Sequence, residues 1–348
     1  MIDKIYKISI TEKDKFLRVL EKFNMLFPFK HLYIQMENNK LICATDSYIS
    51  SIFATFSIDL FLNENICVNF SVIYSVFRNI DEFNLELKNN LLYIISGKSV
   101  FNINLLSKSF TFFDAPDNFY TLKKGVEKAF KFALIAIGDL HNNMKITTIG
   151  NDVFCIATDS MRLSCSKISN LMLPECNLPK DFVNFLLKLL NEQDTLHFSK
   201  IENSLFLKWN DKIYPDIEFM IKIADGVKHV PDNYSNIILQ DKSQQIMLDA
   251  QKLKDILIKA LIFTNENFHI KFEPQENNIK ISASSQEKGK FSALLEGEVS
   301  TNAQSFIING KILLDVLTKD LITIQLIGHA PITVPLADNY YVFMPIEI

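Results

Sequence analysis

Three stretches of the chain repeat one pattern of hydrophobic and polar positions. Each begins with an Asn-containing turn and continues with apolar residues at alternate positions, the period of a half-buried β-strand. The stretches occupy residues 38–47, 151–160 and 277–285. Their aligned alanines are separated by about one domain length, roughly 100–150 residues, and are Ala44, Ala157 and Ala283. The repeat therefore predicts three domains, over residues 1–117, 118–233 and 234–348.

Each repeat also contains two stretches in which apolar residues recur every three or four positions, the period of an amphipathic helix. The first helices are predicted at 12–24, 123–137 and 249–263, and the second at 71–80, 180–191 and 310–319. A pair of strands follows each second helix, at 83–87 with 91–95, 195–198 with 205–209, and 321–326 with 332–335. Runs of hairpins with helices set to one side predict an α+β fold class.

Basic residues share one face of each first helix, opposite the apolar stripe. They are Lys15, Arg18 and Lys22, then Lys124, Lys128 and Lys131, then Lys252 and Lys259. Lysines decorate ordinary solvated helices too, but their recurrence in three equivalent helices favours a surface that meets a phosphate backbone.

The overall composition adds two constraints. Hydrophobic residues make up 48% of the 348 residues, which excludes a disordered chain. The net charge of -4, from 36 basic and 40 acidic residues, excludes a uniformly basic DNA-binding protein. It leaves open a protein that separates its charges, with the acidic excess away from the basic helix faces.

Features of the secretory pathway and of membranes are missing from the sequence. The N-terminus lacks the apolar core of a signal peptide, and no apolar run approaches the roughly 18 residues that span a bilayer. The five cysteines form no C-x-x-C pair, which favours reduced thiols. We therefore expect a cytoplasmic protein.

A search for catalytic chemistry finds little. The six histidines are scattered without zinc-ligand spacing, and glycine-rich phosphate-binding loops are missing. Asp46 and Asp159 both follow Ala-Thr at the end of a predicted strand, where Asp often makes a local turn hydrogen bond, and the third repeat has Ser285 there. We therefore predict no catalytic residue, metal or cofactor. Two alternatives stay open: a metal-dependent hydrolase that uses these two acids, and a β-rich ligand-binding protein without a DNA role.

Five motifs spread over the chain resemble one family. They are Ala-Thr-Asp-Ser-Met-Arg-Leu at 157–163, Tyr-Pro-Asp at 214–216, Ile-Phe-Thr-Asn-Glu-Asn-Phe at 262–268, Leu-Leu-Asp-Val-Leu at 313–317 and Tyr-Val-Phe-Met-Pro-Ile at 341–346. With the threefold repeat, they make the whole chain similar to the bacterial sliding clamp, the β subunit of DNA polymerase III.

The resemblance implies the DNA clamp fold and a head-to-tail homodimeric ring. Helices would line the hole, double-stranded DNA would pass through it without sequence preference, and the tethered polymerase would copy long stretches. The implied partners are the polymerase III catalytic subunit, the clamp loader and repair proteins that carry a short apolar motif.

The resemblance also implies residues for two contacts. The partner-peptide pocket would use Thr158, Ser160, Met161, Arg162, Leu163, Pro215, Met220, Val342, Met344, Pro345 and Ile346. The dimer contact would use Val76, Ile80, Phe101, Ile103, Ile262 and Phe263.

The sequence departs from the family pattern at Ser160-Met161, where the family has Gly-His, at His141, at Glu218-Phe219 and at Glu347-Ile348. These departures leave open which peptide the pocket prefers. They also leave open whether the chain is a main clamp or a diverged accessory one.

Overall fold

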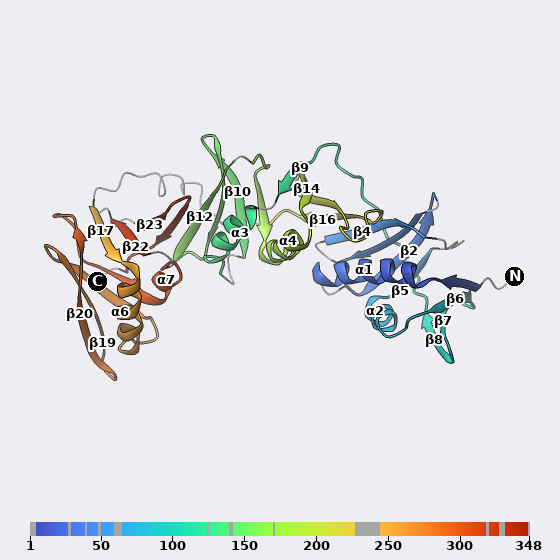
Figure 1. Cartoon of the computed structure of the whole chain (residues 1–348), viewed down its shortest axis with the longest axis horizontal. Coiled ribbons are helices and arrows are strands. Elements are labelled where there is room, and N and C mark those ends of the chain that lie inside the picture. The colour runs from blue at the N-terminus through green and yellow to red at the C-terminus, as the bar shows by residue number, and fades with distance from the viewer. Residues whose placement is uncertain are drawn as a thin grey trace. The chain divides into compact units, whose positions relative to one another are not determined.

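The described residues contain one succession of elements three times: a strand, a helix, four strands, a second helix and three strands. We call these series the first, second and third repeat (Figure 1). In the computed structural model the described residues are 5–26, 29–38, 40–47, 50–58, 65–123, 125–138, 142–169, 171–226, 244–317, 320–326 and 331–346.

The first repeat contains helices α1 (Ile10–Leu26) and α2 (Phe70–Arg78), close to their predicted bounds. Helix α1 begins two residues early because Ser9 and Glu12 form a capping box: the Glu12 N–H donates to Ser9 Oγ at 3.3 Å, and the Ser9 N–H donates to Glu12 Oε2 at 2.9 Å. The strands are β1 (Ile5–Ile8), β2 (His31–Glu37), β3 (Lys40–Asp46), β4 (Ser50–Ser57), β5 (Ile66–Asn69), β6 (Phe83–Lys88), β7 (Leu91–Ser96) and β8 (Ser99–Asn104).

The second repeat contains helices α3 (Val126–Leu134) and α4 (Lys180–Glu192). Helix α3 is shorter than predicted at both ends. Lys123 belongs to the preceding strand, and the N–H groups of residues 135–137 donate to carbonyls three residues back, in a tighter turn. The strands are β9 (Tyr120–Lys123), β10 (Asn143–Ile149), β11 (Asp152–Thr158), β12 (Arg162–Ile168), β13 (Cys176–Pro179), β14 (Thr195–Ile201), β15 (Ser204–Asn210) and β16 (Glu218–Ala224).

The third repeat contains helices α6 (Ala250–Ile262) and α7 (Gly310–Leu314). The prediction for α6 is confirmed, whereas α7 ends earlier than expected because Val316 and Leu317 donate to carbonyls three residues back. The strands are β17 (Gln244–Asp249), β18 (His269–Pro274), β19 (Asn278–Ser285), β20 (Gly289–Val299), β21 (Phe306–Asn309), β22 (Leu321–Leu326), β23 (Ile332–Leu336) and β24 (Asn339–Phe343).

The chain divides into two compact units, whose bounds do not coincide with those of the three repeats. One unit comprises Met1–Lys124 and Asp181–Asp225, and the other comprises Gly125–Lys180 and Gly226–Ile348. The second repeat is shared between them. The predicted boundary after residue 117 lies between β8 and β9, whereas the boundary after residue 233 lies outside the described residues.

Sheets join neighbouring repeats within each unit. In the first unit, an eight-stranded sheet with the order β5-β2-β3-β4-β16-β15-β14-β9 joins the first and second repeats through the antiparallel pair β4–β16. In the second unit, a twelve-stranded sheet joins the second and third repeats through the antiparallel pair β12–β24. The same two positions of the repeat, the third strand after the first helix and the last strand, form both junctions.

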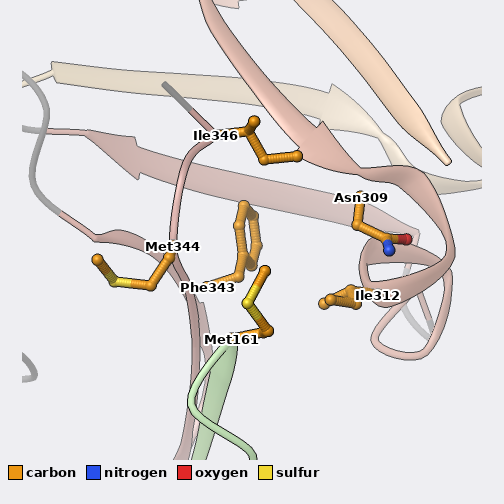
Figure 2. Close-up of a pocket in the computed structure, with 6 residues that line it drawn as sticks. All are labelled: Met161, Asn309, Ile312, Phe343, Met344 and Ile346. Atoms are coloured by element: carbon orange, nitrogen blue, oxygen red, sulfur yellow. The ribbon is translucent and has the colours of Figure 1, made fainter. Parts of the chain in front are cut away.

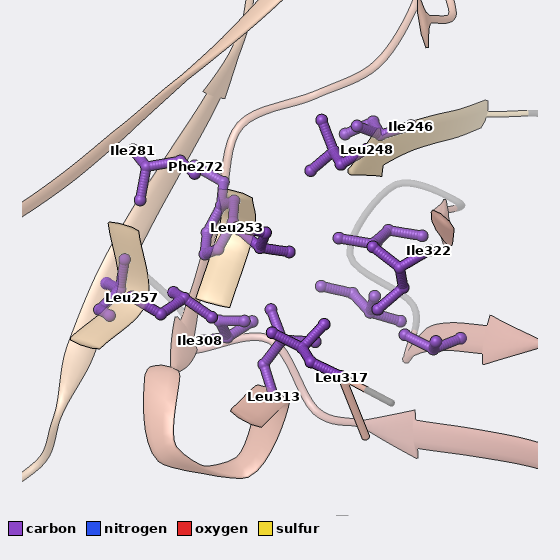
Figure 3. Packing of buried hydrophobic residues seen from close by; sticks show 14 of the residues in the cluster. Ile246, Leu248, Leu253, Leu257, Phe272, Ile281, Ile308, Leu313, Leu317 and Ile322 are labelled. Carbon is purple, nitrogen blue, oxygen red and sulfur yellow. The ribbon is translucent and has the colours of Figure 1, made fainter. Parts of the chain in front are cut away.

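The core of the third repeat shows why its helices pack on the strands. Leu253 and Leu257 of α6 and Leu313 of α7 are fully buried against strand residues such as Phe272 and Ile322 (Figure 3). Each buried Leu or Ile side chain stabilises the fold by roughly 1.5–3 kcal/mol. The apolar stripe of α6 is therefore the face that packs on the strands, whereas its lysines Lys252 and Lys259 are exposed.

Candidate functional site

The basic residues of α3 and α6 lie where the sequence predicted them. Lys128 and Lys131 of α3 are exposed, as are Lys252 and Lys259 of α6. Lys124 lies outside the described residues. These four described lysines are available to a phosphate backbone.

Helix α1 uses its basic residues differently. Lys15 Nζ lies 2.7 Å from Asp216 Oδ2, and the Arg18 guanidinium donates to both Asp211 and Glu192 at 2.9 Å. Lys22 pairs with Glu192 and is 0% exposed, so its ammonium offers no surface to DNA in this structure. These acids belong to the second repeat, so the ion pairs tie the first two repeats together.

The carboxylate of Asp211 lies at the centre of these ion pairs. Its side chain is 0% exposed, with Oδ2 accepting from Arg18. Oδ1 accepts the N–H groups of Ile213 and Tyr214 at 2.9 and 3.0 Å, which shapes the loop before β16. A buried carboxylate with these donors needs its cationic partner. Arg18 therefore has a structural role.

A small apolar pocket lies in the second unit and combines residues of two repeats. Met161 comes from the turn between β11 and β12, and the other lining residues come from the third repeat (Figure 2). The lining consists of Met161, Asn309, Ile312, Phe343, Met344 and Ile346.

The predicted pocket residues fall into three groups. Met161, Met344 and Ile346 line the pocket. Thr158, Leu163 and Val342 are buried, Ser160 is exposed, and Arg162 and Pro345 are half-buried beside it. Pro215 and Met220 belong to the first unit, in the loop before β16 and in β16 itself.

Three lining residues were not predicted. Asn309 and Ile312 are three apart at the start of α7, and this helical spacing is a signal that the sequence offered. Phe343 ends β24 next to the predicted Met344.

The turn that carries Met161 is held by its own side chains. Thr158 Oγ1 donates to the Arg162 carbonyl at 2.7 Å, and Asp159 Oδ1 accepts the N–H groups of Met161 and Arg162 at 3.0 Å. Asp159 thus makes the local turn hydrogen bonds that the sequence favoured over a hydrolase acid. Among the described residues, no group of three His, Cys, Asp or Glu side chains could hold a metal ion.

The C-terminal segment leaves the sheet at the pocket. After β24, the Met344 N–H donates to the Met161 carbonyl at 3.0 Å, and the Ile346 N–H donates to the Ile307 carbonyl at 2.8 Å. Pro345, which has no N–H, stands between these two bonds. The apolar chain end therefore forms one wall of the pocket, with the exposed Met344 side chain at its edge.

Arg162 lies beside the pocket in a charged network. Its Nε donates to Asp159 at 2.8 Å, and its Nη1 donates to Asp315 at 2.5 Å and to the Tyr341 hydroxyl at 3.2 Å. Burial disfavours the guanidinium charge, but Tyr341 and Asp159 outweigh it, so the pKa of Arg162 lies above its ordinary value. Burial raises the pKa of the Tyr341 phenol, so it stays neutral.

The predicted dimer residues differ in exposure. Ile262 at the end of α6 is 63% exposed, and Val76, Phe101 and Phe263 are half-buried. Ile80 and Ile103 are buried within the first repeat, so they offer little surface to a partner.

Two exposed apolar residues of the strands were not predicted as contacts. They are Val100 on β8 and Leu294 on β20, which are 55% and 61% exposed. Leu294 stands in the apolar run Ala293-Leu294-Leu295 and Val100 precedes Phe101, so the sequence alone did not show that these two side chains are exposed.

A second, larger hollow in the third repeat is polar. It lies between the loop after α6 and the turn from β19 to β20, and Lys288 within it donates to the Thr264 carbonyl at 2.8 Å. Its charged lining is mixed, with two glutamates and two lysines, and so it points to no ligand class: Glu266, Glu287, Lys288 and Lys290.

No helix in the described part of the chain is long and apolar enough to cross a membrane. All five cysteines are buried and are thiols rather than disulfides.

No family model matches the chain. The chain is similar to two curated proteins named beta sliding clamp. That of Buchnera aphidicola subsp. Rhopalosiphum padi is 26% identical over 333 residues, covering 89% of this chain and 87% of that protein. That of Buchnera aphidicola subsp. Acyrthosiphon pisum is 25% identical over 226 residues, and this match spans 60% of this chain and 59% of that relative's length.

Solved structures share the fold over the whole chain. The DNA polymerase III subunit beta of Pseudomonas aeruginosa superposes with a TM-score of 0.82 at 16% identity, covering 99% of this chain and 100% of that one. The sliding clamp of Bartonella birtlesii bound to griselimycin gives 0.76 at 17% identity, with the same coverage. The chain therefore has the DNA clamp fold, and the resemblance seen in its sequence is confirmed.

Proposed function

We propose that the chain is a non-catalytic sliding clamp that encircles duplex DNA in the cytoplasm and tethers a replicative DNA polymerase during DNA replication. The observation that carries the proposal is the threefold repeat with its two equivalent junctions, β4–β16 and β12–β24. The strands at these positions that are left over for a third junction are β20, the third strand after α6, and β8, the last strand of the first repeat.

The edges of these two strands support a head-to-tail dimer. β8 is the last strand of the sheet β1-β6-β7-β8, and within the described chain nothing pairs with its outer edge. β20 pairs along one side with β19 and on the other only through residues 297–299 with β17, as far as the described residues go. A second copy that places its β8 on this β20 would complete the third junction, and doing so twice closes a ring.

The four exposed lysines of α3 and α6 support the proposal that DNA passes through the hole of the ring. Lysine contacts to phosphates are independent of base sequence and weaken with salt, so they allow the ring to slide. Retention then comes from topology, and tight binding is unnecessary.

The pocket beside Met161 and Met344 supports a docking site for apolar segments of partner proteins. Methionine side chains adapt to different apolar ligands. The Bartonella birtlesii clamp is described as bound to griselimycin, which is consistent with a ligand site on this fold. The polymerase III catalytic subunit, the clamp loader and repair proteins are the partners we propose.

The experiment that tests the proposal is primer extension by a bacterial polymerase III core and clamp loader from which the native clamp has been removed. Adding the chain should lengthen the products made in a single binding event, because the ring keeps the polymerase on the template. A variant with Met344→Asp is the control, since a charge in the pocket should weaken docking. Products that stay short with the wild-type chain would contradict the proposal.

A further inference from the structure

The charge beside the pocket is set by three side chains at the seam between the second and third repeats. Arg162 pairs with Phe343 across the β12–β24 ladder, so its side chain lies on the same face as Phe343, which lines the pocket. Its guanidinium contacts the carboxylates of Asp159 and Asp315 at 2.8 and 2.5 Å. Two carboxylates against one guanidinium leave one negative charge at this seam.

The more exposed member of the network is a carboxylate. The side chain of Asp315 is 46% exposed, whereas those of Arg162 and Asp159 are 19% and 20% exposed. Asp315 follows α7 three residues after Ile312, so it lies next to a lining residue. The Asp315 carboxylate is therefore the most accessible member of this network for a ligand beside Ile312.

No described residue that lines the pocket carries a positive charge to offset this carboxylate. Helix α7 carries Lys311, but its ammonium lies 3.4 Å from the centre of the Phe268 ring, in a cation–π contact. The pocket lining is thus uncharged, and the exposed carboxylate of Asp315 lies three residues from its lining residue Ile312.

We propose that Asp315 makes this pocket select against acidic partner segments, so that the clamp accepts linear peptides whose apolar anchors are flanked by neutral or basic residues. This inference rests on the proposed function, because it names the class of peptide that the pocket takes. Asp315 acts through its own charge, because Arg162 is already paired with Asp159.

The test compares two fluorescein-labelled peptides with identical leucine and phenylalanine anchors and either Asn or Asp between them. Binding to the full-length chain is measured by anisotropy at low salt. The wild-type chain should bind the Asn peptide about 5-fold more tightly than the Asp peptide, a ratio expected for a partly exposed charge pair. In Asp315→Asn the ratio should fall to about one, because the remaining pair of Arg162 with Asp159 carries no net charge.

Three controls separate charge from structure. Asp315→Glu should restore the discrimination, and Asp320→Asn, which removes an exposed carboxylate of the same repeat, should leave it unchanged. High salt should shrink the wild-type ratio.

An equal ratio in wild type and Asp315→Asn would overturn this inference while leaving the docking site intact. If neither peptide binds the wild-type chain, the proposed pocket fails and this inference fails with it.

Discussion

Ser160 shows how one position stores strain beside the pocket. Its φ is 75°, in the left-handed region that favours glycine. The family motif has a glycine at this position. The conformation is held by neighbours: the Ser160 N–H donates to Thr158 Oγ1 at 3.1 Å, and Asp159 accepts the next two N–H groups. The family motif predicted that this turn contributes to the peptide pocket. It did not reveal that serine would adopt the glycine conformation, because only the surrounding hydrogen bonds impose it.

Ser160→Gly should therefore stabilise the protein. A non-glycine residue in the left-handed region costs about 1–2 kcal/mol, and the greater freedom of unfolded glycine offsets part of the gain, which leaves about 0.5–1 kcal/mol. Urea unfolding of both proteins measures the difference. Ser107→Gly, at an exposed position without positive φ, should be neutral or destabilising. Equal losses in both variants would contradict the strain at Ser160.

At the scale of elements, helices α1, α3 and α6 look alike in sequence and differ in the structure. All three carry a basic face opposite an apolar stripe, and the sequence predicted all three as DNA-facing. In α1 the cations are paired with Asp211 and Glu192, which lie 193 and 174 positions from Arg18. Periodicity describes only one helix at a time, so it predicts the helix and its faces well and cannot detect partners that far along the chain.

This difference predicts separate effects for the two kinds of helix. Lys128→Gln with Lys131→Gln should reduce the salt dependence of DNA binding, with the slope of log K against log salt falling by about 0.9 for each lost phosphate contact. Binding to a short duplex over a range of low salt concentrations measures it. Lys40→Gln, at an exposed lysine of strand β3, is the matched control.

Arg18→Gln should act on stability and leave the salt slope unchanged. Removing one partner of a buried pair leaves the Asp211 carboxylate unpaired, which costs on the order of 2–4 kcal/mol in the free energy of unfolding. If Arg18→Gln lowered the salt slope and left the free energy of unfolding unchanged, Arg18 would be a DNA-facing residue and this account of it would be wrong.

At the scale of the whole molecule, the threefold repeat was the part of the fold that the sequence predicted best. Its elements recur in order, and most predicted helices lie within a few residues of the observed ones. The junctions were harder to predict, because β4 and β16 come from different repeats and pair through backbone groups that carry no residue signature. The same limit applies to the pocket: its C-terminal wall was predicted from the motif, and the contribution of α7 was not.

The open edges of β8 and β20 predict where the dimer can be broken. Leu294→Asp should raise the dissociation constant of the dimer by roughly 30-fold or more, because a charge in an apolar interface costs about 2 kcal/mol. Sedimentation over a concentration series measures this constant. Leu321→Asp is a matched control, since Leu321 is also 61% exposed but lies on β22, inside a sheet. If Leu321→Asp dissociated the dimer and Leu294→Asp did not, β20 would be excluded as the contact.

The retention of the ring on DNA tests the central claim most directly. The chain is loaded by a bacterial clamp loader onto a nicked circular plasmid, separated from free protein, and followed after a restriction enzyme linearises the DNA. A clamp held by topology stays on the circle and is lost from the linear molecule as it slides off the ends. Equal retention on circular and linear DNA would contradict the account.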